Sequence, residues 1–96
     1  MRPSEVLEKN RNIIRAIVAR RRVSNPRVYG SVLHGRDKEG SDLDILVDPS
    51  PETSLFTLGG LQWELEDALG VQVDIKVPGD FPPDIRERLL AEALPI

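Results

Sequence analysis

The sequence predicts an α/β (α+β) fold, in which a small mixed β-sheet is flanked by helices. Two observations carry this prediction. Segments with apolar residues at helical spacing alternate along the chain with short runs in which apolar and polar residues take turns. Proline and glycine stand between these segments and separate them. The predicted order is helix, strand, turn, strand, helix, strand, helix.

Three segments carry the helical pattern: residues 4–22, 55–69 and 83–94. Ser4 is expected to cap the first helix, because its side chain can accept a hydrogen bond from a free backbone N–H group. Gly70 suits the end of the second helix, because a residue in the left-handed conformation commonly closes a helix. Two prolines lead into the third helix.

Three segments are predicted strands: residues 27–30, 43–47 and 71–77. In the second strand, Leu43, Ile45 and Val47 point to one face, because strand side chains alternate. Residues 31–41 are polar and rich in glycine, which predicts a loop or a single turn. Asp48 stands before a proline, which predicts a turn that ends the strand.

The chain of 96 residues is expected to form one domain, residues 1–96. Its net charge of -3 argues against direct nucleic-acid binding, because a phosphate backbone requires a basic surface. The absence of cysteine excludes disulfides and thiolate metal sites, and it fits the reducing cytoplasm, where we expect the protein to act. No apolar run approaches the length of a membrane span, so no membrane partner is expected.

The strand pattern gathers acidic residues on polar faces. Asp42 and Asp44 share the polar face of their strand, and Asp74 lies on the polar face of the next strong strand. If these strands are neighbours, three carboxylates converge and repel one another unless a cation compensates. Lys76 is the single basic residue on these faces, so Mg²⁺ or Mn²⁺, which prefer carboxylate oxygens, is the better candidate. The alternative is a solvated strand end, which an isolated Asp-x-Asp pair usually indicates.

Gly30 and Ser31 stand just upstream, at the end of the preceding predicted strand. Glycine lets a backbone approach a ligand closely. Backbone N–H groups at the start of a turn, together with the Ser31 hydroxyl, can bind an anion. A phosphate site beside a metal site is what nucleotide chemistry requires, so this context favours a functional interpretation of the aspartates.

The stretch GSVLHGRDKEGSDLDILV, residues 30–47, resembles the G-S-x(3)-G-x(5)-S-D-x-D signature of the nucleotidyltransferase superfamily related to DNA polymerase beta. The matching positions are Gly30, Ser31, Gly35, Ser41, Asp42 and Asp44. Asp74 falls where that family has its third metal-binding carboxylate. The resemblance implies a nucleotidyltransferase fold that uses ATP and two Mg²⁺ ions. It implies metal-binding and catalytic roles for Asp42, Asp44 and Asp74. It also implies nucleotide binding by Gly30, Ser31, Gly35 and Ser41.

At this length, the chain resembles the minimal nucleotidyltransferases of bacteria and archaea. These are often antitoxins paired with a HEPN-type ribonuclease toxin, and they transfer AMP from ATP to a tyrosine of that toxin. The resemblance therefore implies a Mg-dependent protein adenylyltransferase that acts as an antitoxin in a hetero-oligomer with its toxin. The sequence departs from the pattern in one place. Many members have arginine just before the second glycine, where this chain has His34.

Two other functions remain open from the sequence. A domain this small could neutralise its partner by complex formation alone, using apolar helix surface. It could instead be a small-molecule adenylyltransferase, although such enzymes normally carry an extra substrate domain. Template-directed polymerisation ranks lowest, because the chain lacks both the length and a basic groove.

Overall fold

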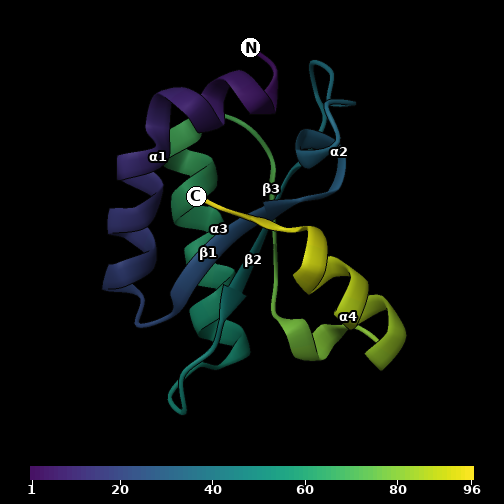
Figure 1. Ribbon diagram of the computed structural model, residues 1–96. Coiled ribbons are helices and arrows are strands. Elements are labelled where there is room, and N and C mark those ends of the chain that lie inside the picture. Colours follow the sequence, from purple (N-terminus) through teal and green to yellow (C-terminus); the bar gives the residue numbers. More distant parts are fainter.

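The computed structural model describes all 96 residues as a four-stranded sheet with helices on both sides (Figure 1). The elements follow in the order α1 (Pro3–Arg20), β1 (Ser24–Tyr29), α2 (Gly30–Leu33), β2 (Leu43–Asp48), α3 (Leu55–Leu69), β3 (Val73–Lys76), the 3₁₀ turn η1 (Pro78–Asp80), α4 (Pro83–Glu92) and β4 (Leu94–Pro95). The strand order is β3-β2-β1-β4, with β1 antiparallel to both β2 and β4, and with β2 and β3 parallel. None of the helices has the length and apolar character needed to cross a membrane. The mixed sheet and its flanking helices confirm the predicted fold class.

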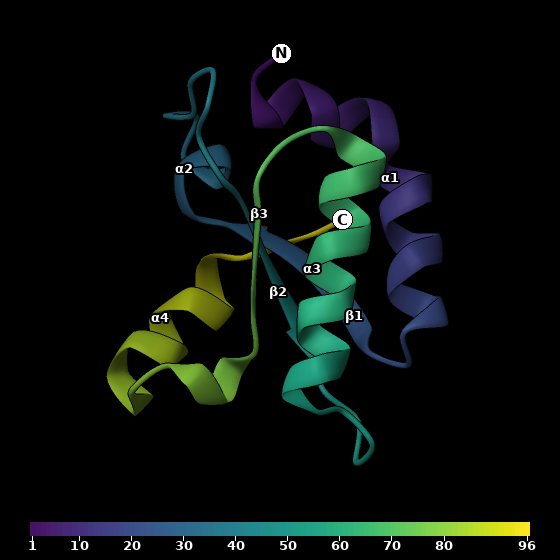
Figure 2. The same ribbon diagram turned by 180° about the vertical axis from the view of Figure 1, so that it is seen from behind.

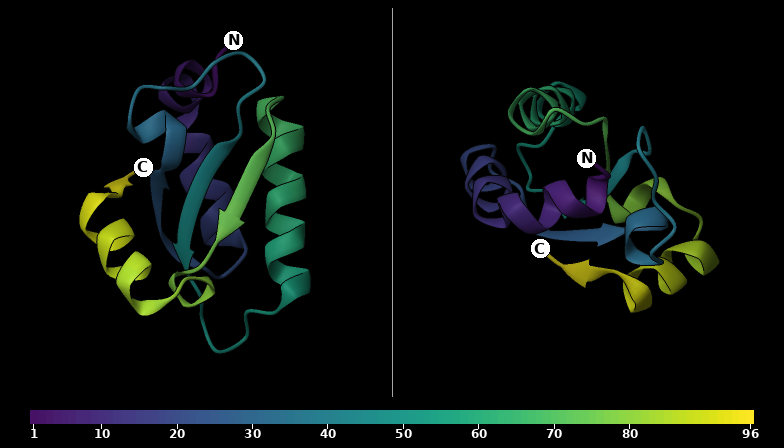
Figure 3. Two further views of the ribbon diagram at one scale, coloured as in Figure 1. Left: turned by 90° about the vertical axis from the view of Figure 1, so that its right-hand side faces the viewer. Right: turned by 90° about the horizontal axis from the view of Figure 1, so that it is seen from above.

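Helices α1 and α3 cover one face of the sheet, and α4 lies on the other side (Figure 3). The covered face carries Leu43, Ile45 and Val47 of β2, whose side chains have no exposed surface. Leu61 and Leu65 of α3 lie one helical turn apart and are equally buried against them. Because burying one such side chain stabilises the fold by about 1.5–3 kcal/mol, this layer is the main source of its stability.

The first helix begins earlier than its pattern predicted and is capped differently. Pro3 is its first residue and Arg2 its N-cap, so the prediction that Ser4 caps the helix is wrong. The N–H of Ser4 donates to Asp37 Oδ2 at 2.8 Å, and Asp37 is buried in the loop after α2. A carboxylate from a distant loop therefore satisfies a free N–H group of the first turn. Proline favours the earlier start, because its missing N–H costs nothing at the first helical position.

The short strands differ most from their predicted limits. β1 starts earlier, at Ser24, and β3 spans only Val73–Lys76. Leu94–Pro95 form β4, a strand that the sequence did not indicate. The short helix α2 spans residues 30–33, where the sequence predicted the last residue of a strand at Gly30 and a loop or single turn from residue 31. Short strands carry weak patterns, because tertiary pairing decides them more than local preference does.

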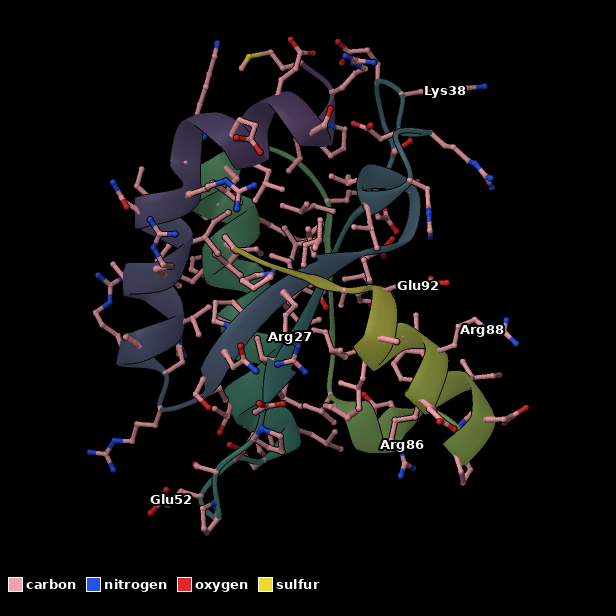
Figure 4. The ribbon with its side chains drawn as sticks, viewed as in Figure 1. Arg27, Lys38, Glu52, Arg86, Arg88 and Glu92 are labelled. Atoms are coloured by element: carbon pink, nitrogen blue, oxygen red, sulfur yellow. The ribbon has the colours of Figure 1, made fainter.

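Helix α4 is packed loosely. None of its residues is buried, and Ile85 and Leu90 keep 40% and 46% of their surface exposed. Arg86, which Figure 4 labels, ties it to the preceding turn, because its guanidinium donates to the carbonyl oxygens of Pro78 at 2.9 Å and Phe81 at 2.8 Å. α4 therefore covers its side of the sheet only in part and leaves acidic side chains there accessible.

Candidate active site

The face of the sheet opposite α1 and α3 carries two of the predicted acidic residues, Asp44 and Asp74, on neighbouring strands. The strand register places Asp44 beside Asp74 of β3, and beside Tyr29 of β1 on its other flank. Neighbouring strands lie about 5 Å apart, so paired residues share one face at that spacing. Tyr29, Asp44 and Asp74 therefore form a row across three strands. Asp42 immediately precedes β2 and is exposed, and its charge raises the pKa of Asp44.

Gly30 lies directly against Asp44. Its φ is +73°, a left-handed conformation that favours glycine, and a Cβ added to it would stand 2.2 Å from Asp44 Oδ2. Both the backbone conformation and the available space therefore require glycine at this position. The first glycine of the motif therefore contacts its second aspartate. The backbone between β1 and α2 passes directly over the Asp44 carboxylate at Gly30.

Ser31 and Gly35 stand at the two ends of α2. Ser31 lies in the first turn, where backbone N–H groups lack helical partners. Hydrogen bonding from its N–H to the Asp44 carboxylate lowers the pKa of Asp44 and so opposes the effect of burial. Gly35 has a φ of +68°, and its N–H donates to the Val32 carbonyl at 3.3 Å, which ends the helix. Gly35 thus shapes the turn through its backbone conformation.

Ser41 and His34 have partners inside the protein. The Ser41 hydroxyl accepts a hydrogen bond from the Lys38 N–H at 2.9 Å and closes the turn before β2, in the loop where Figure 4 labels Lys38. Its hydroxyl hydrogen stays available to a ligand. His34 Nε2 lies 3.6 Å from Glu92 Oε2 of α4, and both side chains are about half exposed. His34 therefore joins α2 to α4 in the place where many relatives have arginine.

Negative charge accumulates at Asp44. Burial is the largest cause that raises the pKa of Asp44, and the charges of Asp74 and Asp42 raise it further, to about 6. The Ser31 backbone and Lys76 oppose this rise. Lys76 Nζ stands 3.7 Å from Asp74 Oδ1. One ammonium group cannot balance three carboxylates, so this face keeps an excess of negative charge.

The donor set suits a hard divalent cation. Asp42, Asp44 and Asp74 offer carboxylate oxygens, which Mg²⁺ prefers over other ligands. The excess charge at Asp44 is the kind that such an ion neutralises. No three acidic or histidine side chains gather closely enough to hold a metal ion as they stand. The carboxylate oxygens of these residues are suitable Mg²⁺ ligands, and Asp44 and Asp74 lie on one face of the sheet. A single metal site formed by all three aspartates stays a prediction.

The sequence prediction missed Tyr29. Its ring meets Phe81 edge to face, with the ring centroids 6.1 Å apart. Burial raises the pKa of its hydroxyl, and the nearby carboxylates of Asp44, Asp74 and Asp80 raise it further. Tyr29 therefore belongs to the acidic row. An antiparallel pairing between the strand that ends at Gly30 and the next strand could have found it, because that pairing places Tyr29 opposite Asp44.

The sequence prediction also missed the partner of Asp48. Arg27, two residues before Tyr29 and on the same face, keeps only 8% of its side chain exposed. Its guanidinium donates to Asp48 Oδ1 at 3.0 Å, and Figure 4 shows it on β1. The sequence predicted Asp48 as a turn former after the strand, but it is the last residue of β2 and the ion-pair partner of Arg27.

The acidic face is open. None of the three hollows in the surface includes Gly30, Ser31 or the three aspartates. Ser41 lines one hollow of about 270 Å³. The largest, about 450 Å³, lies at the end of β3 and includes Lys76. A ligand at the aspartates would rest on the sheet surface beside the Gly30–Ser31 turn.

Known proteins share this sequence and fold. Residues 10–96 match the family described as nucleotidyltransferase domain. A candidate protein adenylyltransferase of Methanocaldococcus jannaschii is 36% identical over 89 residues, covering 93% of this chain and 95% of that protein. A solved structure of a candidate minimal nucleotidyltransferase superposes with a TM-score of 0.87 at 38% identity, covering 97% of this chain and 95% of the other.

A more distant structure shares the fold alone. It is a chain in the crystal structure of a toxin–antitoxin with AMP-PNP, with a TM-score of 0.76 and 19% identity, covering 90% of this chain and 71% of the other. The family match spans the candidate site, from Gly30 to Asp74, and all four strands of the sheet. This chain therefore belongs to the nucleotidyltransferase domain family, and its fold is that of a minimal nucleotidyltransferase.

Proposed function

We propose that this chain is a Mg²⁺-dependent protein adenylyltransferase, which moves AMP from ATP to a hydroxyl of a partner protein. The contact between Gly30 and Asp44 carries the proposal, because it sets the turn that begins α2 directly against a carboxylate that neighbours Asp74. Family membership gives the class of reaction, nucleotidyl transfer. The identity with a candidate protein adenylyltransferase supports a protein as the acceptor.

Each motif residue has a role in this proposal. Gly30 and Ser31 bind the phosphates through backbone N–H groups and the serine hydroxyl, while Gly35 and Ser41 shape the loop around the nucleotide. The residues that would hold two Mg²⁺ ions are Asp42, Asp44 and Asp74. When bound, Mg²⁺ supplies positive charge against the triphosphate and against the charge that develops in the transition state.

The acceptor approaches from the β3 side. Its hydroxyl oxygen attacks the α-phosphorus of ATP, a new O–P bond forms, and the bond from that phosphorus to the β-bridging oxygen breaks. Pyrophosphate leaves with the bonding electrons, and Asp74 takes the proton of the hydroxyl. In-line displacement needs the attacking and leaving groups on opposite sides. Asp74 lies across Asp44 from the β1 strand that ends at Gly30, which fits this requirement.

The partner in this proposal is a HEPN-type ribonuclease toxin, and the acceptor is one of its tyrosines. A chain of the same fold occurs in a toxin–antitoxin crystal structure with AMP-PNP, an ATP analogue, which supports both partner and nucleotide. The transfer would silence the toxin, so this chain would act as its antitoxin. We expect the two proteins to form a hetero-oligomer in the cytoplasm, where ATP is available.

Neutralisation by binding alone is a second candidate. Large apolar side chains stay exposed on α3 and α4: Phe56 is 93% exposed, Trp63 67% and Leu90 46%. Exposed apolar surface of this kind marks protein interaction sites. Binding through such surface would not need the carboxylates, so the two candidates differ in their dependence on Asp42 and Asp44.

The double variant Asp42→Asn/Asp44→Asn separates the two candidates. It removes two carboxylate charges and nearly preserves side-chain shape, so the fold should survive. The proposed toxin partner is mixed with either form, ATP and Mg²⁺, and its intact mass is measured. A growth assay with both proteins reports rescue from the toxin.

An adenylyltransferase predicts that the wild type adds AMP units to the toxin. The double variant should still bind the toxin, but it should add no AMP and should not rescue growth. Full rescue by the double variant, with no mass change even from the wild type, would overturn catalysis and support neutralisation by binding.

A further inference from the structure

The largest hollow of the surface lies at the free edge of the sheet. It has a volume of about 450 Å³. Its apolar walls are Leu55, Leu58, Ile75 and Phe81, and the remaining lining residues are Gly59, Gln62, Lys76 and Asp80. We name it the edge pocket. Figure 2 shows β3 running beside α3, and Figure 3 shows β3 as the outermost strand on that side. Lys76 connects the edge pocket to the acidic row, because its ammonium group contacts Asp74.

The free edge of β3 has one unblocked position. The Leu43 N–H donates to the Gln72 carbonyl at 2.8 Å, and the alternation of a parallel ladder then turns the backbone groups of residues 73, 75 and 77 away from β2. The outward N–H of Val73 donates to Glu66 Oε2, and that of Val77 donates to Asp80 Oδ2, both at 3.0 Å.

Two acidic side chains therefore cap the edge on either side of Ile75. Capped N–H groups cannot pair with another chain, which is how edge strands avoid indiscriminate association. Ile75 lies between the two caps, and it is also a wall of the edge pocket. The edge can thus form backbone hydrogen bonds with a single residue of an incoming segment, at Ile75. The adjoining edge pocket can take a side chain of that segment.

Strand alternation decides where the side chains of such a segment go. A residue paired with Ile75 turns its side chain toward α3, as Ile75 does, and so into the edge pocket. The next residue of an extended segment turns its side chain to the opposite face, where Asp74 and Lys76 lie. One apolar residue in the edge pocket therefore places the neighbouring residue beside Asp74.

We infer that the edge pocket and the Ile75 backbone form the docking site for the acceptor segment of the partner. The segment binds in extended form, with a large apolar side chain in the edge pocket and the acceptor tyrosine immediately next to it in sequence. The acceptor role rests on the proposed adenylyl transfer. The docking itself does not, because it requires neither ATP nor Mg²⁺.

Gly59 offers a clean test of the docking. Gly59 lines the edge pocket, and a Cβ added to it meets no atom within 4 Å, so the helix has room for a longer side chain at the mouth of the pocket. Glycine is also a poor helix former, so Gly59→Gln should not weaken α3. Ala68→Gln is the matched control, because Ala68 is exposed on the same helix and outside the edge pocket.

The probes are two blocked tetrapeptides, Gly-Leu-Tyr-Gly and Gly-Ala-Tyr-Gly, added to ¹⁵N-labelled protein up to millimolar concentration. We expect the leucine peptide to shift the amide signals of Ile75 and Gly59. The alanine peptide should bind about tenfold more weakly, because it leaves the edge pocket unfilled. Gly59→Gln should weaken the leucine peptide by about the same factor, and Ala68→Gln should leave its affinity unchanged.

The outcomes separate the docking from the chemistry. Equal affinity for both peptides, or no shift at Ile75 with either, would overturn the docking site. If the leucine peptide shifts Ile75 but gains no AMP with ATP and Mg²⁺, while the toxin gains none either, the docking stands and the proposed function fails. If the toxin gains AMP as fast from Gly59→Gln as from wild type, the proposed function stands and the docking site is overturned.

Discussion

Asp44 and Asp48 lie on the same face of β2, and the protein treats their charges in opposite ways. Burial acts to raise the pKa of Asp48, but hydrogen bonds from Asn25 at 3.1 Å and Arg27 at 3.0 Å outweigh it and lower that pKa. Asp44 is also partly buried, and its neighbour Asp74 is another carboxylate, so its pKa rises to about 6.

The difference separates structure from function within one strand. At Asp48 the chain supplies its own cation, the buried Arg27, and the pair is complete without a ligand. At Asp44 the chain supplies one partly exposed lysine to a group of three aspartates. The fold neutralises Asp48 but leaves Asp44 among other carboxylates. Asp44 is therefore the better candidate to bind a cation from solution.

The largest expected effect is on the rate of AMP transfer. Asp44→Asn should reduce the rate by about a thousandfold or more, because it removes a charge that the reacting centre needs, equivalent to about 4 kcal/mol. Asp48→Asn should keep the rate within about threefold, because Asp48 serves Arg27 and not the ligand. Initial rates of AMP incorporation into the toxin, at saturating ATP and Mg²⁺, measure both. Equal losses in the two variants would contradict the division of roles along β2.

The second effect is on stability. Asp48→Ala should lower the free energy of unfolding by about 2 kcal/mol, because it leaves the buried guanidinium of Arg27 without its carboxylate. Urea unfolding followed by circular dichroism measures the change. Glu87→Ala, at an exposed position of α4, is the control and should change stability by less than about 0.5 kcal/mol. A loss at Asp48 no larger than this would mean that solvent replaces the ion pair.

The two ends of β2 also show how far the sequence could lead. Strand alternation predicted that Asp44 and Asp74 lie on polar faces and come together if their strands are neighbours, and the register places the two residues side by side. The sequence could not predict that Arg27 pairs with Asp48, because that contact depends on the antiparallel register of β1 and β2. Local pattern sets which face a side chain takes, and pairing between strands sets its partner.

The limits of the helices show the same dependence. The apolar spacing of residues 55–69 predicted α3 with the same limits as the structure, because a long amphipathic pattern is a local property. The cap of α1 could not be predicted, because Asp37 reaches Ser4 from a loop far along the chain. Gly30 lies between these cases. The sequence motif could be recognised, but the need for glycine there comes from a tertiary contact. A Cβ at this position would stand 2.2 Å from the Asp44 carboxylate.

A smaller effect is expected at the turn that faces Asp44. Ser31→Ala should weaken ATP binding by about tenfold, because it removes one hydrogen bond to a charged phosphate and leaves the backbone N–H groups in place. Calorimetric titration with ATP and Mg²⁺ measures the affinity. Ser24→Ala, at the exposed start of β1, is the matched control. Unchanged affinity in Ser31→Ala would make this serine structural and leave nucleotide binding to the backbone.

The smallest effect is the pH dependence of stability, which should have opposite signs at the two ends of β2. The pKa of Asp44 is about 6 in the folded protein against 3.8 for the free group, so the folded state holds its proton more tightly. The stability linked to Asp44 is therefore fully present below about pH 4 and is lost as the pH rises to about 6. Asp44→Asn should raise the stability of the metal-free protein at pH 7 by about 1 kcal/mol, after allowance for solvent screening, or about 4–8 °C in Tm.

Asp48 should behave in the reverse manner. Its pKa is lowered, so its contribution is present above about pH 4 and is lost as the pH falls through its folded-state pKa. Thermal unfolding in EDTA, between about pH 3 and pH 7.5, tests both residues against the wild type. The gain from Asp44→Asn should grow with pH from almost nothing at pH 4, whereas the loss from Asp48→Asn should shrink toward pH 3. A gain from Asp44→Asn that is the same at every pH would show that its cause is packing and not the crowding of three carboxylates.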